Sequence, residues 1–210
     1  NKPLFMHSVD KALKSKLFKS IIIVSNAPIK NINDKSIKVI KGGKERYQSS
    51  QKALNFLKNK KIKNVFIHDA ARPNFSIKLL KKLNANLKNN KAVVPFVKTD
   101  SSTKYKNGNR LQNLDRDKLI FTQTPQCFDY KTIYKISRSN KNLVTDEASL
   151  CLNYKTRVKF IKGEENNFKI TTKSDLRKFN IKSFYGIGFD IHRLIKNKTL
   201  YLGGLKIPFN

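Results

Sequence analysis

An acid and an arginine follow directly after a short apolar stretch in "NVFIHDAARPNFS", residues 64–76. Asp69 could hold a metal ion or a ribose hydroxyl, and Arg72 can bind a phosphate with its forked guanidinium. Between them, Ala70 and Ala71 leave room for a ring or a sugar. A second interpretation is structural, because Asp69 and Arg72 could pair with each other and close the loop.

Two glycines precede a helical pattern in "VIKGGKERYQSS", residues 39–50. Gly42 and Gly43 let a ligand approach the backbone closely. The N–H groups at the start of the following helix suit an anion or the polar edge of a base. A plain turn also explains the pair, so the two glycines alone are a weak signal.

Two further motifs carry polar side chains. The stretch "FTQTPQCF", residues 121–128, places hydroxyls and amides around a rigid proline, which suits a phosphate or a polyol and equally fits a polar loop: Thr122, Gln123, Thr124 and Gln126. The stretch "VTDEASL", residues 144–150, predicts a helix that Thr145 caps, with Asp146 and Glu147 in its first turn. The helix start explains that second motif without a ligand.

Strand and helix patterns alternate along most of the chain. The sequence predicts strands at 20–25, 37–40, 64–68, 92–97 and 157–161, and helices at 45–59, 76–88, 130–138, 145–153 and 174–181. Ser76 and Ser174 are the expected caps of two of these helices. This rhythm is typical of an α/β fold, with a mostly parallel sheet and helices on both faces.

In such sheets, ligands bind outside the carboxyl ends of the strands. Asp69 and Arg72 follow a predicted strand and therefore lie where a site is expected. Lys169, in "NFKITTKSDL", would point toward the same place, although one lysine among so many proves little. The polar region 98–118 breaks the rhythm and contains "NGN", a hairpin turn signal. It predicts an extended arm that could reach a partner subunit, and a disordered loop is the alternative.

Composition narrows the class of protein. The 210 residues carry a formal net charge of +31, but the lysines are spread along the whole chain without a dense block. Solvated faces explain this better than a nucleic-acid-binding stripe, and no recognition helix or arginine cluster is evident. No apolar run could span a bilayer, and Cys127 and Cys151 have no metal spacing. We therefore expect a cytoplasmic protein with reduced cysteines, no nucleic-acid partner and no membrane partner.

The motifs together resemble the 2-C-methyl-D-erythritol 4-phosphate cytidylyltransferase family of isoprenoid biosynthesis. The resemblance covers residues 1–181 and rests on "GGKERYQSS", "FIHDAARP", "DRDKLIFTQTPQCF", "VTDEAS" and "FKITTKSDL". It implies a Rossmann-like nucleotidyltransferase with a projecting β-arm. The implied reaction joins CTP to 2-C-methyl-D-erythritol 4-phosphate in the methylerythritol phosphate pathway and releases pyrophosphate, with Mg²⁺ as the cofactor.

The resemblance also implies roles for single residues. The nucleotide would be bound by Gly42, Gly43, Ser49, Asp69 and Ala70. The second substrate would be bound by Asp69, Arg72, Arg116, Thr124, Thr145 and Lys169, of which Lys169 and Arg116 would be catalytic. Arg116 and Thr124 would serve the other subunit of a homodimer formed through the 98–118 arm.

The last segment, "FYGIGFDIHRLIKNKTLYLGGLKIPF" at 184–209, resembles the opening of 2-C-methyl-D-erythritol 2,4-cyclodiphosphate synthase. The resemblance implies that residues 182–210 are the first strands of an incomplete second α/β domain, a lyase that is trimeric when complete. Asp190 and His192 would ligate Zn²⁺ or a similar divalent ion, since residues i and i+2 of a strand share a face. The whole gene product would be bifunctional.

The chain also departs from the family pattern. The family's glycine-rich phosphate loop is missing before Asn1, so we expect the chain to be inactive or nearly so as it stands. Lys44 follows the glycine pair where the family often has an acid, and "TDSSTK" at 99–104 fits the family pattern only with a shift. A sugar-phosphate nucleotidyltransferase with another acceptor is the main alternative. A basic nucleic-acid-binding protein is the weaker one.

Overall fold

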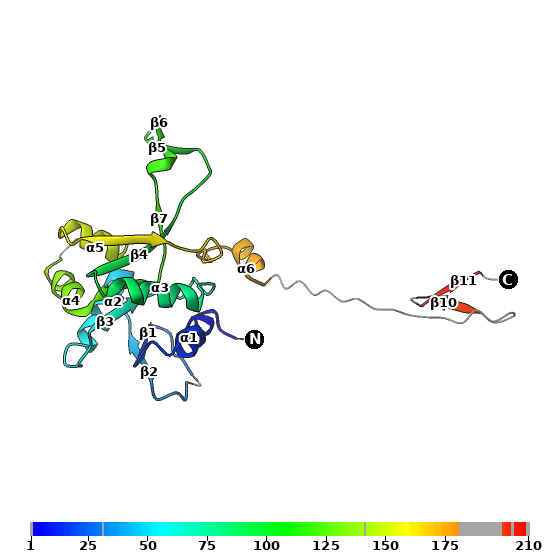
Figure 1. Ribbon diagram of the computed structural model, residues 1–210, viewed down its shortest axis with the longest axis horizontal. Coiled ribbons are helices and arrows are strands. Elements are labelled where there is room, and N and C mark those ends of the chain that lie inside the picture. Colours follow the sequence, from blue (N-terminus) through cyan, green and yellow to red (C-terminus); the bar gives the residue numbers. More distant parts are fainter. Residues whose placement is uncertain (1, 31, 141, 181–198, 203, 209–210) are drawn as a thin grey trace. The chain divides into compact units, whose positions relative to one another are not determined.

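The computed structural model describes residues 2–30, 32–140, 142–180, 199–202 and 204–208. The chain divides into two compact units, Asn1–Phe179 and Asn180–Asn210, and each is described by itself (Figure 1). In the second unit, β10 (Leu200–Leu202) pairs antiparallel with β11 (Leu205–Ile207).

A five-stranded sheet forms the centre of the first unit. It contains β3 (Asn64–Ile67), β8 (Gln126–Asp129), β4 (Ala92–Val97), β7 (Phe121–Thr122) and β9 (Val158–Lys162). Only the β4–β9 pair is parallel, because β3–β8, β4–β8 and β4–β7 are antiparallel. The prediction of a mostly parallel sheet is therefore wrong for these five strands. The strands β7 and β8 follow the arm without a helical crossover and so run against β4.

A separate pair of parallel strands precedes this sheet in the sequence. It consists of β1 (Ile21–Ser25) and β2 (Ile37–Lys41), as the apolar runs at 20–25 and 37–40 predicted. Helix α1 (Leu4–Ser15) precedes it and was not predicted. The helix ends at Lys16, whose left-handed backbone stops the helical hydrogen-bond pattern.

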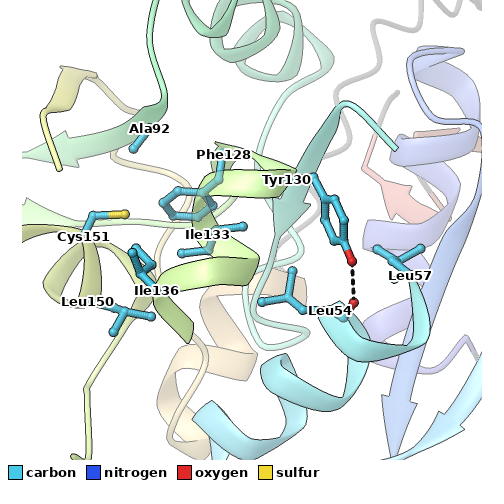
Figure 2. Close-up of a cluster of buried hydrophobic side chains, with 9 residues drawn as sticks. All are labelled: Leu54, Leu57, Ala92, Phe128, Tyr130, Ile133, Ile136, Leu150 and Cys151. Carbon is cyan, nitrogen blue, oxygen red and sulfur yellow. Dashed lines mark hydrogen bonds between the residues drawn. The ribbon is translucent and has the colours of Figure 1, made fainter. Parts of the chain in front are cut away.

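Helices cover both faces of the central sheet, as predicted. Neighbouring residues of one strand point to opposite faces, so Phe128 joins one apolar cluster and Cys127 the other. The first cluster packs α2 (Arg46–Phe56), α4 (Tyr130–Ser139) and α5 (Glu147–Asn153) against the sheet (Figure 2). The second packs α3 (Ile77–Leu87) on the opposite face. In the first cluster, the hydroxyl of Tyr130 donates to the carbonyl of Leu54 at 2.9 Å.

Polar side chains set the helix starts. Ser76 caps α3 as predicted, because its hydroxyl accepts from the amide of Leu79 at 3.0 Å. Helix α5 is capped by Asp146, which accepts from the Ser149 amide at 2.8 Å, so the assignment of this cap to Thr145 was wrong. None of the helices in the described ranges is long and apolar enough to cross a membrane.

The last helix of the first unit also begins earlier than expected. Helix α6 spans Lys173–Asn180, so Ser174 lies inside it and is not its cap. The hydroxyl of Thr172 instead accepts from the amide of Asp175 at 3.2 Å. The carboxylate of Asp175 in turn accepts from the amides of Thr171 and Thr172.

The 98–118 region forms the expected arm. Its strands β5 (Thr103–Asn107) and β6 (Arg110–Leu114) pair antiparallel, and the hairpin stands away from the central sheet (Figure 1). Gly108 occupies the turn with a φ of 56°, which glycine adopts at little cost. A 3-10 turn, η1 (Arg116–Lys118), leads back to the body. The alternative of a disordered loop is therefore wrong.

Candidate active site

Three cationic side chains converge on the carboxylate of Asp69, which lies two residues after the end of β3. Arg46, the first residue of α2, donates from Nε to Oδ1 of Asp69 at 3.0 Å. The other oxygen, Oδ2, lies 3.7 Å from Nε of Arg72 and 3.8 Å from Nζ of Lys169. The structure thus brings together Asp69, Arg72 and Lys169, three of the residues that the sequence predicted. Three cations against two acids, Asp69 and Glu147, leave an excess of positive charge, which favours an anionic ligand.

These charges keep Asp69 ionised. Burial alone would raise the pKa of its carboxyl, since the side chain is only 16% exposed. The charge and hydrogen bond of Arg46, and then the charges of Lys169 and Arg72, outweigh burial and hold the pKa below its ordinary value. Asp69 is therefore a hydrogen-bond acceptor at neutral pH.

Arg72 is only partly satisfied by its neighbours. Its Nη1 donates to the carbonyl of Asn167 at 2.9 Å, and its backbone amide donates to the carbonyl of Asp69. Its Nε is buried and has no hydrogen-bond partner among the described residues. The internal ion pair with Asp69 exists, but 3.7 Å is too long for a hydrogen bond. An unmet donor of this kind costs about 1–3 kcal/mol until an acceptor reaches it.

Two residues of the site were missed by the sequence reasoning. Arg46 makes a two-pronged contact with Glu147 at the start of α5, with distances of 3.1 Å from Nη1 and 2.9 Å from Nη2. Glu147 is 4% exposed, so this ion pair is almost fully buried on the side of the acid. Arg46 stands inside the quoted "GGKERYQSS", but only the fold shows that it reaches Asp69.

Thr124 lies against Asp69 but is buried. Its hydroxyl accepts from the backbone amide of Asp69 at 3.0 Å and lies 3.0 Å from Nδ1 of His68. Only 4% of Thr124 is exposed. In this structure the threonine predicted to bind substrate holds the turn that carries Asp69.

The rest of the "FTQTPQ" motif joins parts of the scaffold. Gln123 donates to the carbonyl of Glu164 at 2.8 Å, and Gln126 donates to Asp146 at 2.8 Å. Thr122 donates to the same carboxylate at 3.1 Å. Gln123 and Gln126 are buried and hydrogen-bonded inside the protein, which favours the structural interpretation of this motif.

The two glycines form a close turn before α2. The amide of Gly43 donates to the hydroxyl of Ser49 at 3.0 Å, and its carbonyl accepts from Asn26 at 2.9 Å. A Cβ atom at Gly43 would lie 2.3 Å from the Cβ of Gln48. A Cβ atom at Gly42 would lie 3.1 Å from the Ser49 hydroxyl. Close packing therefore explains both glycines, and the Ser49 hydroxyl is already engaged with the backbone.

The remaining predicted site residues lie elsewhere or at the surface. Ala70 is exposed beside Asp69. Arg116 is exposed at the base of the arm, where its Nη1 donates to the carbonyl of Asp100 at 2.6 Å. Thr145 is exposed before α5 and lies 3.2 Å from the hydroxyl of Ser149. Neither contact includes Asp69, Arg72 or Lys169. The predicted zinc ligands Asp190 and His192 fall outside the described residues.

The described residues form no cage for the expected Mg²⁺ ion, and Asp69 is the acid that would hold one through Oδ2. At phosphate sites Mg²⁺ is bound by one or two carboxylates, substrate phosphates and water, so the cluster fits an ion that arrives with the triphosphate. In the cluster, Oδ1 of Asp69 already accepts from Arg46, Oδ2 faces two further cations, and Glu147 is held by Arg46. Within the described ranges, no group of three or more His, Cys, Asp or Glu could hold a metal.

A cavity of about 650 Å³ borders the cluster. Its lining includes Arg46, Ser49, Asp69 and Ala70 together with apolar side chains of β1 and β3. Among the described residues, β1 pairs only with β2 and β3 only with β8. The volume is within the range of small-molecule pockets. The polar lining residues suit a sugar and a phosphate, while the apolar ones do not suit a charged group.

Comparison with known proteins agrees with this fold. The family profile of 2-C-methyl-D-erythritol 4-phosphate cytidylyltransferase matches residues 1–181. The chain is 47% identical over 211 residues to the bifunctional enzyme IspD/IspF of Pelagibacter ubique (strain HTCC1062), covering 99% of this chain and 57% of that protein. It is 31% identical over 214 residues to the protein of the same name from Campylobacter fetus, covering 99% and 55%. The chain therefore spans just over half the length of these curated relatives.

Solved structures show the same relationship. The 2-C-methyl-D-erythritol 4-phosphate cytidylyltransferase of Francisella tularensis superposes with a TM-score of 0.76 at 30% identity, covering 84% of this chain and 86% of that one. The bifunctional IspDF of Campylobacter jejuni superposes with a TM-score of 0.73 at 30% identity, covering 99% and 56%. Because the profile spans most of the chain and solved members share its fold, the chain belongs to the 2-C-methyl-D-erythritol 4-phosphate cytidylyltransferase family.

Proposed function

We propose that this chain carries the site of an enzyme that transfers a cytidylyl group from CTP to 2-C-methyl-D-erythritol 4-phosphate and releases pyrophosphate. The observation that carries the proposal is the convergence of Arg72 and Lys169 on Asp69, which lines the cavity, in a chain of this family. Two cations that face an ionised acid suit a substrate that presents phosphate and hydroxyl groups together.

The reaction needs no covalent intermediate on the enzyme. A phosphate oxygen of the methylerythritol substrate attacks the α-phosphorus of CTP, a new P–O bond forms, and the bond to the β-phosphate breaks in line. Pyrophosphate leaves with the electron pair of that bond. Catalysis then consists of positioning the two phosphates and neutralising the charge of the transition state.

The cluster supplies these functions. Arg72 and Lys169 neutralise the phosphate oxygens, and Lys169 is the more accessible of the two, with 44% of its side chain exposed against 15% for Arg72. Asp69 accepts a hydrogen bond from a sugar hydroxyl through Oδ2. Gly42, Gly43, Ser49 and Ala70 border the nucleotide. Arg116, Thr124 and Thr145 complete the proposed site for the second substrate, Thr124 by holding the turn of Asp69.

We also propose that the arm joins two copies of this chain. Apolar side chains on the arm stand in solvent, since Tyr105 is 53% exposed and Leu111 is 70% exposed. Exposed apolar groups on a projecting hairpin favour an interface. A partner's arm would bring its Arg116 toward the acceptor phosphate.

The last residues support a second proposal. The matches to the bifunctional relatives cover 99% of this chain, so they extend beyond the cytidylyltransferase profile. We propose that residues 182–210 begin a cyclodiphosphate synthase domain in which Asp190 and His192 hold a zinc ion. Replacing both with alanine should abolish zinc binding by the protein that the full natural reading frame encodes. The rate of cytidylyl transfer should stay within twofold.

Pyrophosphate release from CTP and 2-C-methyl-D-erythritol 4-phosphate tests the main proposal in the full natural reading frame that contains these residues. Lys169→Gln and Arg72→Lys should each lower kcat/KM by about 100-fold or more. Lys169→Gln removes a positive charge at the transition state, and Arg72→Lys removes the forked geometry of the guanidinium. Lys159→Gln, an exposed change on β9, is the control and should stay within twofold. Turnover of other sugar phosphates in place of methylerythritol 4-phosphate would mean that the acceptor was misidentified. No nucleotide turnover would overturn the proposal.

A further inference from the structure

Arg46 joins two acids from distant parts of the chain. Its guanidinium uses Nη1 and Nη2 on the carboxylate of Glu147, at 3.1 and 2.9 Å, and Nε on Oδ1 of Asp69, at 3.0 Å. Both edges of the planar group are therefore engaged at once. Such a fork fixes orientation as well as charge, and a lysine cannot reproduce it.

The anchor of this bridge is the more deeply buried acid. Glu147 is 4% exposed, Asp69 is 16% exposed and Arg46 is 33% exposed. Glu147 begins α5, whose Leu150 and Cys151 belong to the first apolar cluster. The position of the Arg46 guanidinium is therefore set by the core, and Asp69 receives it.

The bridge leaves one oxygen of Asp69 available. Oδ1 accepts from Arg46, while Oδ2 lies 3.7 Å from Arg72 and 3.8 Å from Lys169, beyond hydrogen-bond length for both. The backbone amide of Asp69 is held separately by Thr124. Both the backbone and one carboxylate oxygen are thus fixed, and the free oxygen faces the side of the two phosphate-binding cations.

We propose that Arg46 is a positioning residue that, anchored on Glu147, fixes the carboxylate of Asp69 so that Oδ2 meets a hydroxyl of the bound substrate. This inference rests on the proposed function. The competing role for Arg46 is direct binding of a nucleotide phosphate. Because three of its N–H groups already serve carboxylates, the geometry favours the positioning role.

A double-mutant cycle separates the two roles. Arg46→Gln should lower kcat/KM for cytidylyl transfer by about 10- to 100-fold, because a small displacement of a catalytic group has effects of that size. In an Asp69→Asn background the same change should cost less than threefold, since Arg46 acts through Asp69. Effects that multiply fully in the double variant would overturn the proposal and assign Arg46 to the phosphate.

Three further variants complete the design. Glu147→Gln removes the charge of the anchor and leaves Arg46 in place, so it should lower kcat/KM by less than Arg46→Gln does. Lys58→Gln removes one exposed positive charge just beyond α2 and should stay within twofold. Leu54→Ala loosens the core under α2 and should lower Tm while leaving the acid limb of the pH–rate profile where it is. In Arg46→Gln that limb should move to higher pH.

A second readout does not need turnover. The carboxyl carbon of Asp69, assigned through its loss in Asp69→Asn, can be titrated by NMR in the full chain. Arg46 is the largest influence that lowers the pKa of this carboxyl, so Arg46→Gln should move the titration to higher pH, and Lys58→Gln should not. An unchanged titration in Arg46→Gln would overturn the inference. If the unmodified protein fails to turn over CTP while this titration moves, the proposed function fails and the bridge stands.

Discussion

The backbone amide of Asp69 donates a 3.0 Å hydrogen bond to the hydroxyl of Thr124. The same hydroxyl lies 3.0 Å from Nδ1 of His68, whose Nε2 lies 3.0 Å from the carbonyl of Arg72. A carbonyl only accepts, so we assign the ring proton to Nε2 and the acceptor role to Nδ1. The hydroxyl then accepts from Asp69 and donates to His68. A chain of hydrogen bonds through Thr124 and His68 therefore holds the turn after β3.

Thr124→Val should destabilise the protein by about 1–3 kcal/mol, because it leaves the Asp69 amide and the His68 ring nitrogen without partners. Thr124→Ser keeps the hydroxyl and should lose less than half of that. Urea unfolding of both variants measures the difference. Equal losses would mean that the methyl group of Thr124, and not its hydroxyl, carries the effect.

His68 makes stability depend on pH. Burial lowers the pKa of its ring to about 4, from an ordinary value of 6.5. As pH falls from 6.5 toward 4, His68 becomes protonated in the unfolded chain but stays neutral in the folded one. Stability is therefore lost over this pH range. The loss from this group should reach about 3 kcal/mol by pH 4.

His68→Gln is the control for this dependence. It removes the titrating ring, while Asp69 and the other carboxylates still titrate in both proteins. The difference in free energy of unfolding between pH 6.5 and pH 4 should therefore be smaller in the variant. The same slope in both proteins would show that His68 is protonated as readily in the folded state as in the unfolded one.

Gly43→Ala should disturb the start of α2. The new Cβ would lie 2.3 Å from the Cβ of Gln48, so the turn must move, at a cost of about 1–3 kcal/mol. KM for CTP should rise with it, because Gly43 borders the proposed nucleotide site. Gly108→Ala is the matched change, since its Cβ meets nothing within 4 Å and only its φ of 56° is unfavourable. It should cost about 1 kcal/mol and leave KM unchanged.

Leu111→Asp tests the arm as an interface. Leu111 is 70% exposed on β6, and a charge there should weaken association of two copies by at least tenfold. Leu143→Asp is a matched control, because Leu143 is 76% exposed but lies away from the arm. Sedimentation over a range of protein concentrations measures both variants. Equal effects of the two changes would place the interface elsewhere.

Local signals in the sequence were sufficient for most of the elements that carry the site. The apolar run before Asp69 predicted β3, and Ser76 predicted the start of α3. Helix α1 was not predicted, although Phe5, Val9 and Ala12 recur at helical spacing.

Direction and long-range contacts could not be predicted in the same way. Periodicity identifies a strand but does not say which neighbour it pairs with, and β7 and β8 are too short, with two and four residues, to show a period. The contact between Arg46 and Glu147 joins residues far apart in the chain, so no local pattern reveals it. Asp69 and Arg72 were predicted to lie at the site because they follow β3, and Lys169 was expected to point toward them. Lys169 does so although it lies in no strand.

Among the described strands, β1 pairs only with β2 and β3 only with β8, which leaves one edge of each without a strand partner. Edges with free N–H and C=O groups template pairing with other chains, which leads to aggregation. At low ionic strength, a net charge of +31 keeps copies apart. Added salt shortens the reach of that repulsion to about 3 Å at 1 M. We therefore expect the protein to remain free of aggregates at low salt and to form larger particles as salt rises, because the charge of the lysine-rich surface opposes aggregation.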